Sequence, residues 1–144
     1  REFIMIQQNT APYAALVLRL ALGVMFISHA LLKVIVFTVP GTVQFFESVG
    51  LPGALAYVTI IAELGAGALL LLGLGTRWVA LATVPLLLGA AWLHVPNGLV
   101  FSALGGGCEY PVFLAVAAVV QFLLGDGAYA LSVRRAAPSE VRAV

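Results

Sequence analysis

An apolar stretch near the start of the chain, residues 16–33, contains three residues that titrate or carry charge: Arg19, His29 and Lys33. A charged side chain at bilayer depth is unfavourable by roughly 2.5–3.5 kcal/mol on insertion scales, so it usually faces the protein interior. At about 100° per residue, all three side chains fall on one helical face about 80° wide. The stretch is therefore predicted to be a membrane helix with a polar face, which needs partners on other helices.

The composition of the chain supports a membrane protein. Its 144 residues are 62% hydrophobic and only 9% charged, whereas a soluble domain of this size needs far less apolar surface. The formal net charge of +1 provides no basic surface for nucleic acid. A single cysteine, Cys108, excludes an intrachain disulfide and a CxxC redox pair.

Four apolar segments define the predicted architecture: residues 12–37, 52–74, 77–95 and 110–131. We predict an all-α fold, an integral membrane four-helix bundle whose second and third helices form an antiparallel hairpin across the tight turn before Arg77. Residues 38–53 separate the first two segments. Their aromatic pair, Phe45 and Phe46, predicts a short interfacial helix with aromatic rings at headgroup level.

Three regions are expected along the chain. Residues 1–11 form an N-terminal tail, with residues 1–4 expected to precede a native start at Met5; residues 12–131 form the transmembrane domain; residues 132–144 form a C-terminal tail. Positive charge gathers in the turn between the second and third segments and after the fourth, at Arg77, Arg134, Arg135 and Arg142. By the positive-inside rule, both termini are predicted to be cytoplasmic.

Two of the intramembrane charges, Arg19 and Glu63, are predicted to form an ion pair. At about 1.5 Å per residue, Arg19 lies roughly 10 Å from the cytoplasmic edge and Glu63 roughly 16 Å from the outer edge. In a hydrocarbon core about 30 Å thick these depths nearly coincide. Two interpretations stay open: the pair locks the first two helices together, or it forms a proton or ligand site.

A second polar group is predicted near the outer edge of the bundle. The ends of three helices bring together His29, Lys33, His94, Cys108 and Glu109. One interpretation is a pocket for an anionic or quinone-like molecule, in which the histidines supply hydrogen bonds or protons near neutral pH. Another is an interfacial salt bridge between Lys33 and Glu109. A metal site has acceptable ligand types, but no HxxH or HExxH spacing supports it, and we expect none.

The chain resembles the DoxX family. The resemblance rests on LRLALGVMFISHALLK (18–33), AELGAGALLLLGLGTR (62–77), the AAWLH ending at His94, and Glu109 at the start of the last segment. It covers residues 16–131, and it departs from the family pattern at Ala30, where members often have glycine. The resemblance implies a small four-helix protein of the bacterial inner membrane. Some members of that family are subunits of thiosulfate:quinone oxidoreductases, and others associate with redox or detoxification enzymes.

Three functions follow as alternatives. The first is a membrane redox subunit that binds a quinone or similar small molecule, non-covalently, and acts with a soluble redox enzyme. The second is a carrier of a small anion or proton, which would need homo-oligomerisation to form a pathway. The third is a non-catalytic membrane scaffold or assembly protein. The lipid bilayer is a partner in all three, and nucleic acid in none.

Overall fold

The computed structural model describes residues 7–132, and within that range every regular element is helical. The α-helices are α1 (Ala11–Leu31), α2 (Val39–Ser48), α3 (Ala54–Leu72), α4 (Thr76–His94) and α5 (Glu109–Leu124). A π-helical turn, Leu32–Val36, continues α1, and a 3₁₀ turn, Val95–Asn97, continues α4. The predicted all-α class is confirmed.

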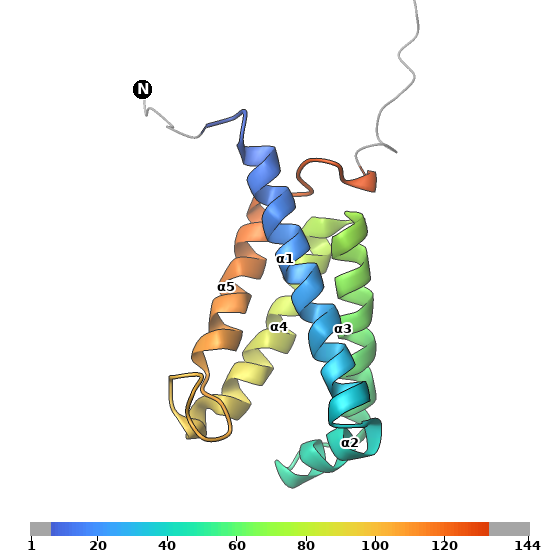
Figure 1. Ribbon diagram of the computed structural model, residues 1–144, viewed down its shortest axis with the longest axis vertical. Coiled ribbons are helices and arrows are strands. Elements are labelled where there is room, and N and C mark those ends of the chain that lie inside the picture. Colours follow the sequence, from blue (N-terminus) through green and yellow to red (C-terminus); the bar gives the residue numbers. More distant parts are fainter. Residues whose placement is uncertain (1–6, 133–144) are drawn as a thin grey trace, which may run out of the picture.

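The long helices run alternately up and down (Figure 1). α1 packs mainly on α3, and α4 packs mainly on α5; contacts between α3 and α4 and between α1 and α5 join the two pairs. The start of α1, the α3–α4 turn and the segment after α5 lie at one end, called here the N-terminal end. The opposite end, called the α2 end, carries α2 and the α4–α5 loop.

Three helical stretches within residues 7–132 are long and apolar enough to cross a membrane: Ala11–Val36, Ala54–Leu72 and Thr76–Asn97. The fold is thus a helical membrane bundle, as predicted. The expected helix over 110–131 is shorter than predicted, because α5 ends at Leu124 where Gly125 adopts φ 85°. At 16 residues, α5 is about 24 Å long.

Glycines shape two places in the bundle. Gly73 (φ 69°) closes α3, with Gly73 N–H donating to Leu70 O and Leu74 N–H donating to Leu69 O, the pattern of a Schellman motif. Farther along the bundle, a Cβ at Gly67 would lie 2.9 Å from the Gly23 carbonyl oxygen. The backbones of α1 and α3 therefore approach each other closely at these two glycines, as small residues allow in membrane helices.

The core between the four long helices is apolar at mid-height. It is built from Leu22, Phe26, Leu70, Ala80, Leu87, Ala115, Ala117 and Ala118. Phe26 therefore packs in the core, while Trp92 is exposed on α4.

The predicted interfacial helix exists as α2, which packs on α3 and on the π-helical turn.

Candidate functional site

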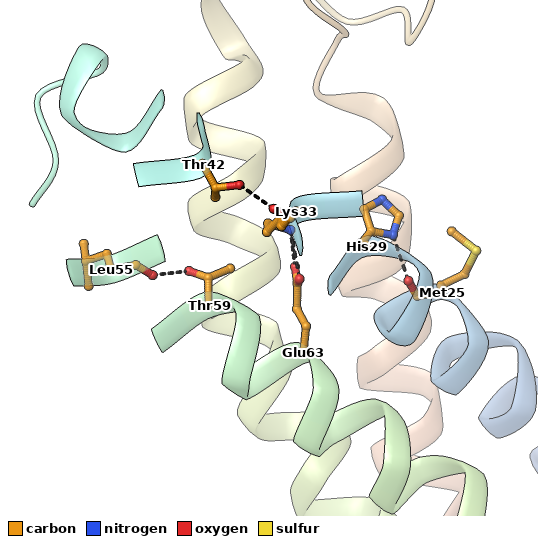
Figure 2. A network of polar contacts seen from close by, with 7 residues as sticks. All are labelled: Met25, His29, Lys33, Thr42, Leu55, Thr59 and Glu63. Atoms are coloured by element: carbon orange, nitrogen blue, oxygen red, sulfur yellow. Dashed lines mark hydrogen bonds and ion pairs between the residues drawn. The ribbon is translucent and has the colours of Figure 1, made fainter. Parts of the chain in front are cut away.

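An ion pair between Lys33 and Glu63 is the centre of the polar network near the α2 end (Figure 2). Lys33 Nζ lies 2.8 Å from both carboxylate oxygens of Glu63. The side chains are 19% and 8% exposed, respectively, so the pair is largely removed from solvent. Removing one member of a pair in such surroundings leaves the other charge buried without a partner.

The π-helical turn positions Lys33 for this contact. In Leu32–Val36 the backbone forms the wider hydrogen bond from Phe37 N–H to Leu32 O. The carbonyl of Lys33 accepts a hydrogen bond from the hydroxyl of Thr42 at 2.9 Å, and that hydroxyl is also 3.0 Å from Thr38 O. The first turn of α2 is thus fastened to the backbone of the residue that carries the charge. Single π-helical turns of this kind occur frequently at functional sites.

The predicted Arg19–Glu63 ion pair is wrong, because Glu63 binds Lys33 instead. Side chains in an α-helix lean toward the N-terminus of their own helix. Since α1 and α3 are antiparallel, Arg19 leans toward the N-terminal end of the bundle and Glu63 leans toward the α2 end. The close approach of Gly23 and Gly67 also places Arg19 level with the last turn of α3 and not with Glu63. Lys33 and Glu63, by contrast, lean toward each other.

Arg19 lies instead at the N-terminal end, where it is 1% exposed. Its Nη2 donates to the carbonyl of Ala128 at 3.2 Å. A Cβ added at Gly73 would overlap Arg19 Nη1, so the guanidinium occupies space that a glycine leaves open at the end of α3.

The two histidines share one hydrogen-bond arrangement. His29 Nδ1 lies 2.8 Å from Met25 O, and His94 Nδ1 lies 2.7 Å from Ala90 O. Because a carbonyl oxygen can only accept, each Nδ1 carries the hydrogen, and in the neutral ring Nε2 is an acceptor. The His29 ring also stacks on Tyr110, with centroids 5.8 Å apart and planes at 22°. Each imidazole therefore offers a nitrogen able to take a proton from a ligand.

The α4–α5 loop forms a separate polar group around Glu109. Glu109 Oε1 accepts a hydrogen bond of 2.7 Å from the backbone N–H of Phe101. Asn97 Nδ2 donates to the carbonyls of Gly105 and Gly106, both at 3.0 Å. An open depression of about 420 Å³ beside this group is lined by Phe101, Glu109, Tyr110 and Phe113.

The structure therefore divides the predicted outer-edge cluster. The alternative of a Lys33–Glu109 salt bridge is wrong, because Lys33 binds Glu63 and Glu109 holds the loop backbone. His29 stacks on Tyr110, the residue after Glu109, while His94 lies against Gly106, whose added Cβ would be 3.4 Å from His94 Cδ2. Cys108 is a partly exposed free thiol. In residues 7–132, no three His, Cys, Asp or Glu side chains are grouped so as to hold a metal ion.

Two residues of the site were not singled out as site residues from the sequence. Thr42 gives little signal, because a threonine near a helix start is ordinarily a capping residue. Tyr110 could not be singled out, because its stacking on His29 depends on the register between α1 and α5, which sequence spacing alone does not set.

Comparison with known proteins places the chain in a family. A family model described as DoxX matches residues 14–96, which run from the first turn of α1 past the end of α4 and include Lys33 and Glu63. A protein of Bacillus subtilis (strain 168) named "Putative oxidoreductase CatD" is 43% identical over 75 residues, which are 52% of this chain and 54% of that protein. The chain thus spans about half the length of the curated relative it matches. No solved structure matches this chain. With these matches, and with three helical stretches in residues 7–132 that are long and apolar enough to cross a membrane, the chain is a membrane protein that belongs to the DoxX family.

Proposed function

We propose that the chain is the membrane subunit of a redox system, and that it binds a quinone-like molecule at the α2 end and acts with a soluble redox enzyme. The family membership and the name of the Bacillus subtilis relative support a link to redox chemistry. The family model covers the part of the chain that carries Lys33, Glu63 and the two histidines. The cofactor we propose is a quinone held without a covalent bond.

The observation that carries the proposal is the environment of His29. Its Nε2 is free to accept a hydrogen bond, its ring stacks on Tyr110, and Tyr110 also lines the depression with Phe101 and Phe113. Aromatic side chains favour stacking with a flat ring, and ligand pockets combine such walls with a few polar groups. Glu109 is the carboxylate in the wall of the depression.

The proton chemistry of quinones fits these side chains. A quinone takes up two protons with two electrons when it becomes a quinol, so its site needs groups that exchange protons near neutral pH. A histidine with an acceptor at Nε2 receives a proton from a quinol hydroxyl, and its protonated form returns one to a quinone oxygen. In this proposal His29 transfers the two protons one after the other, and the soluble redox enzyme exchanges the two electrons with the quinone. The Lys33–Glu63 pair, one helical turn from His29 on α1, keeps the surroundings polar.

The surroundings of the proposed subunit follow from the sequence. We place the protein in the bacterial inner membrane with both termini in the cytoplasm, because Arg77 lies at the N-terminal end of the bundle. Three of the arginines used in that prediction, Arg134, Arg135 and Arg142, lie outside the described residues. The α2 end then faces the periplasm. A homo-oligomer is compatible with the many apolar side chains exposed on the long helices.

The test is a binding measurement with two matched variants. Decylubiquinone and menadione are added to the purified protein, and binding is followed by quenching of intrinsic fluorescence and by the shift in melting temperature. His29→Phe keeps a ring on Tyr110 but removes both nitrogens, so we expect at least a tenfold loss of affinity, about 1.4 kcal/mol. His94→Phe makes the same change at the other histidine and should leave affinity within about twofold. Unchanged affinity in His29→Phe, or no quinone binding by the wild type, overturns the proposal.

A scaffold or assembly role is the second candidate, favoured by the burial of the Lys33–Glu63 pair. A pair that only locks α1 onto α3 affects folding and nothing else. In that case Glu63→Gln and His94→Ala lower the amount of folded protein, and every ligand or activity measurement per folded molecule stays the same.

A further inference from the structure

Three buried side chains at the N-terminal end carry polar atoms that make no hydrogen bond to any residue within 7–132. The atoms are Nε and Nη1 of Arg19, Oγ1 of Thr76 and Oε1 of Gln121. Arg19 is 1% exposed, and Thr76 and Gln121 are both 0% exposed. Buried polar groups in folded proteins are almost always hydrogen-bonded, to protein or to ordered water. These four atoms are therefore expected to have a hydrogen-bond partner.

The helix register places the three side chains in one layer. The stacking of His29 on Tyr110 sets α1 against α5. Arg19 lies ten residues before His29, and Gln121 lies eleven residues after Tyr110. These are about 15 Å and 16 Å along two antiparallel helices, so the two positions are level.

The other two helices reach the same level. The Arg19 guanidinium lies against Gly73 at the end of α3, and Thr76 begins α4 three residues later. Arg77 Nε donates to Phe122 O at 3.1 Å, which fixes the start of α4 beside Gln121. Each long helix therefore contributes one position to the layer, and the glycine of α3 leaves room for the arginine.

The donors and the acceptor in this layer select the kind of ligand. Gln121 Nε2 donates to Gly125 O at 2.8 Å, so the amide orientation is fixed and Oε1 is left as an acceptor. Arg19 presents only donors, and the Thr76 hydroxyl can do either. A halide or oxyanion would suit Arg19 and be repelled by Gln121 Oε1, whereas a water molecule accepts from the first and donates to the second.

The charge balance of the layer agrees with a neutral ligand. Asp126 lies within electrostatic range of Arg19, and its Oδ2 accepts a hydrogen bond from the Ser132 hydroxyl. The guanidinium therefore already has a carboxylate nearby, although not within ion-pair distance. We propose that Arg19, Thr76 and Gln121 form a site for ordered water, which accepts from the guanidinium and donates to the Gln121 amide oxygen.

An apolar layer separates this water site from the Lys33–Glu63 pair. Leu22 and Phe26 lie between Arg19 and His29 on α1, and Leu70 lies between Glu63 and Gly73 on α3; all three are buried in the core. On α1 and α3, the buried side chains between the two sites are thus apolar. The inference stands independently of the quinone proposal.

Nuclear magnetic resonance of the full chain tests the site. Protein labelled with ¹⁵N at arginine and glutamine is reconstituted in lipid nanodiscs, and transfer of magnetisation from water to the side-chain N–H groups is measured, with Arg19→Lys used to assign the Arg19 signal. We expect a direct cross-peak between water and Arg19 Nε–H, and no movement of that signal across a chloride titration. Absence of the cross-peak overturns the proposal, and so does a saturable shift with chloride, which would identify an anion site.

Two variants localise the water. Gln121→Met, similar in length but without an acceptor, should weaken the Arg19 cross-peak at least severalfold. The matched control is Thr83→Val, because the Thr83 hydroxyl is buried but donates to Ala80 O within its own helix; it should leave the cross-peak unchanged. An unaltered cross-peak in folded Gln121→Met overturns the assignment of Gln121. Should that variant fail to fold, the wild-type cross-peak and the chloride titration still decide the proposal.

Discussion

Lys33 and Glu63 meet because their helices are antiparallel and each side chain leans toward the start of its own helix. Lys33 Nζ is equidistant, at 2.8 Å, from both oxygens of the Glu63 carboxylate. The pair joins the end of the first membrane helix to the middle of α3, and it lies beneath the first turn of α2 (Figure 2).

Glu63→Gln is expected to destabilise the folded protein by about 3–5 kcal/mol, because it leaves the Lys33 ammonium buried without a counter-charge. The double variant Lys33→Met/Glu63→Leu should recover most of that loss, since it removes both charges. Denaturant unfolding in detergent measures the free energies. Glu47→Gln, at an exposed position on α2, is the control and should have little effect. Equal losses in the single and the double variant would contradict this role of the pair.

Thr42→Val should cost about 1–3 kcal/mol, because it leaves the Lys33 carbonyl without its hydrogen-bond donor. Thr42→Ser keeps the hydroxyl and should recover most of the loss. Thr59→Val is the matched control: its hydroxyl donates to Leu55 O of its own helix, and we expect a change within about 0.5 kcal/mol. The ¹⁵N resonance of Lys33 Nζ reports on the ion pair directly. If the chemical shift of this resonance is the same in Thr42→Val as in the wild type, then Thr42 does not position Lys33.

Gly73→Ala should destabilise the protein by about 2–5 kcal/mol, from left-handed backbone strain and overpacking together. The added Cβ would meet Arg19 Nη1 and lie 2.7 Å from Ala130 Cα. Gly65→Ala is the control, because a Cβ there meets nothing within 4 Å and the helix should gain about 0.5–1 kcal/mol. Melting temperatures of the two variants, compared with the wild type, should move in opposite directions.

Tyr110→Leu should lower quinone affinity about tenfold, because it removes both the stacking partner of His29 and part of the wall of the depression. Tyr110→Phe retains the ring and should bind within about twofold of the wild type. Fluorescence quenching by decylubiquinone measures both. An equal loss in Tyr110→Phe and Tyr110→Leu would show that the hydroxyl, which both variants lack, makes the contact and not the ring.

The bundle follows from local features of the sequence. Apolar segments of about 20 residues can satisfy their backbone in lipid only as helices, so residues 12–37, 52–74 and 77–95 predicted α1, α3 and α4 with small errors at the ends. Gly125 ended α5 early, because a glycine at positive φ leaves the helical backbone conformation regardless of the apolar residues beyond it.

The sequence by itself determined that the chain is a helical membrane protein and that its intramembrane ionisable residues face inward. Hydropathy and helical periodicity can be read within a single segment. They therefore establish the membrane helices and the inward direction of these residues without knowledge of the other segments. Only the tertiary structure decided which of those residues meet, giving Lys33 rather than Arg19 to Glu63 and Tyr110 to His29. Such contacts depend on side-chain direction, on a π-helical turn and on the register between helices, all of which are fixed only when the segments pack together.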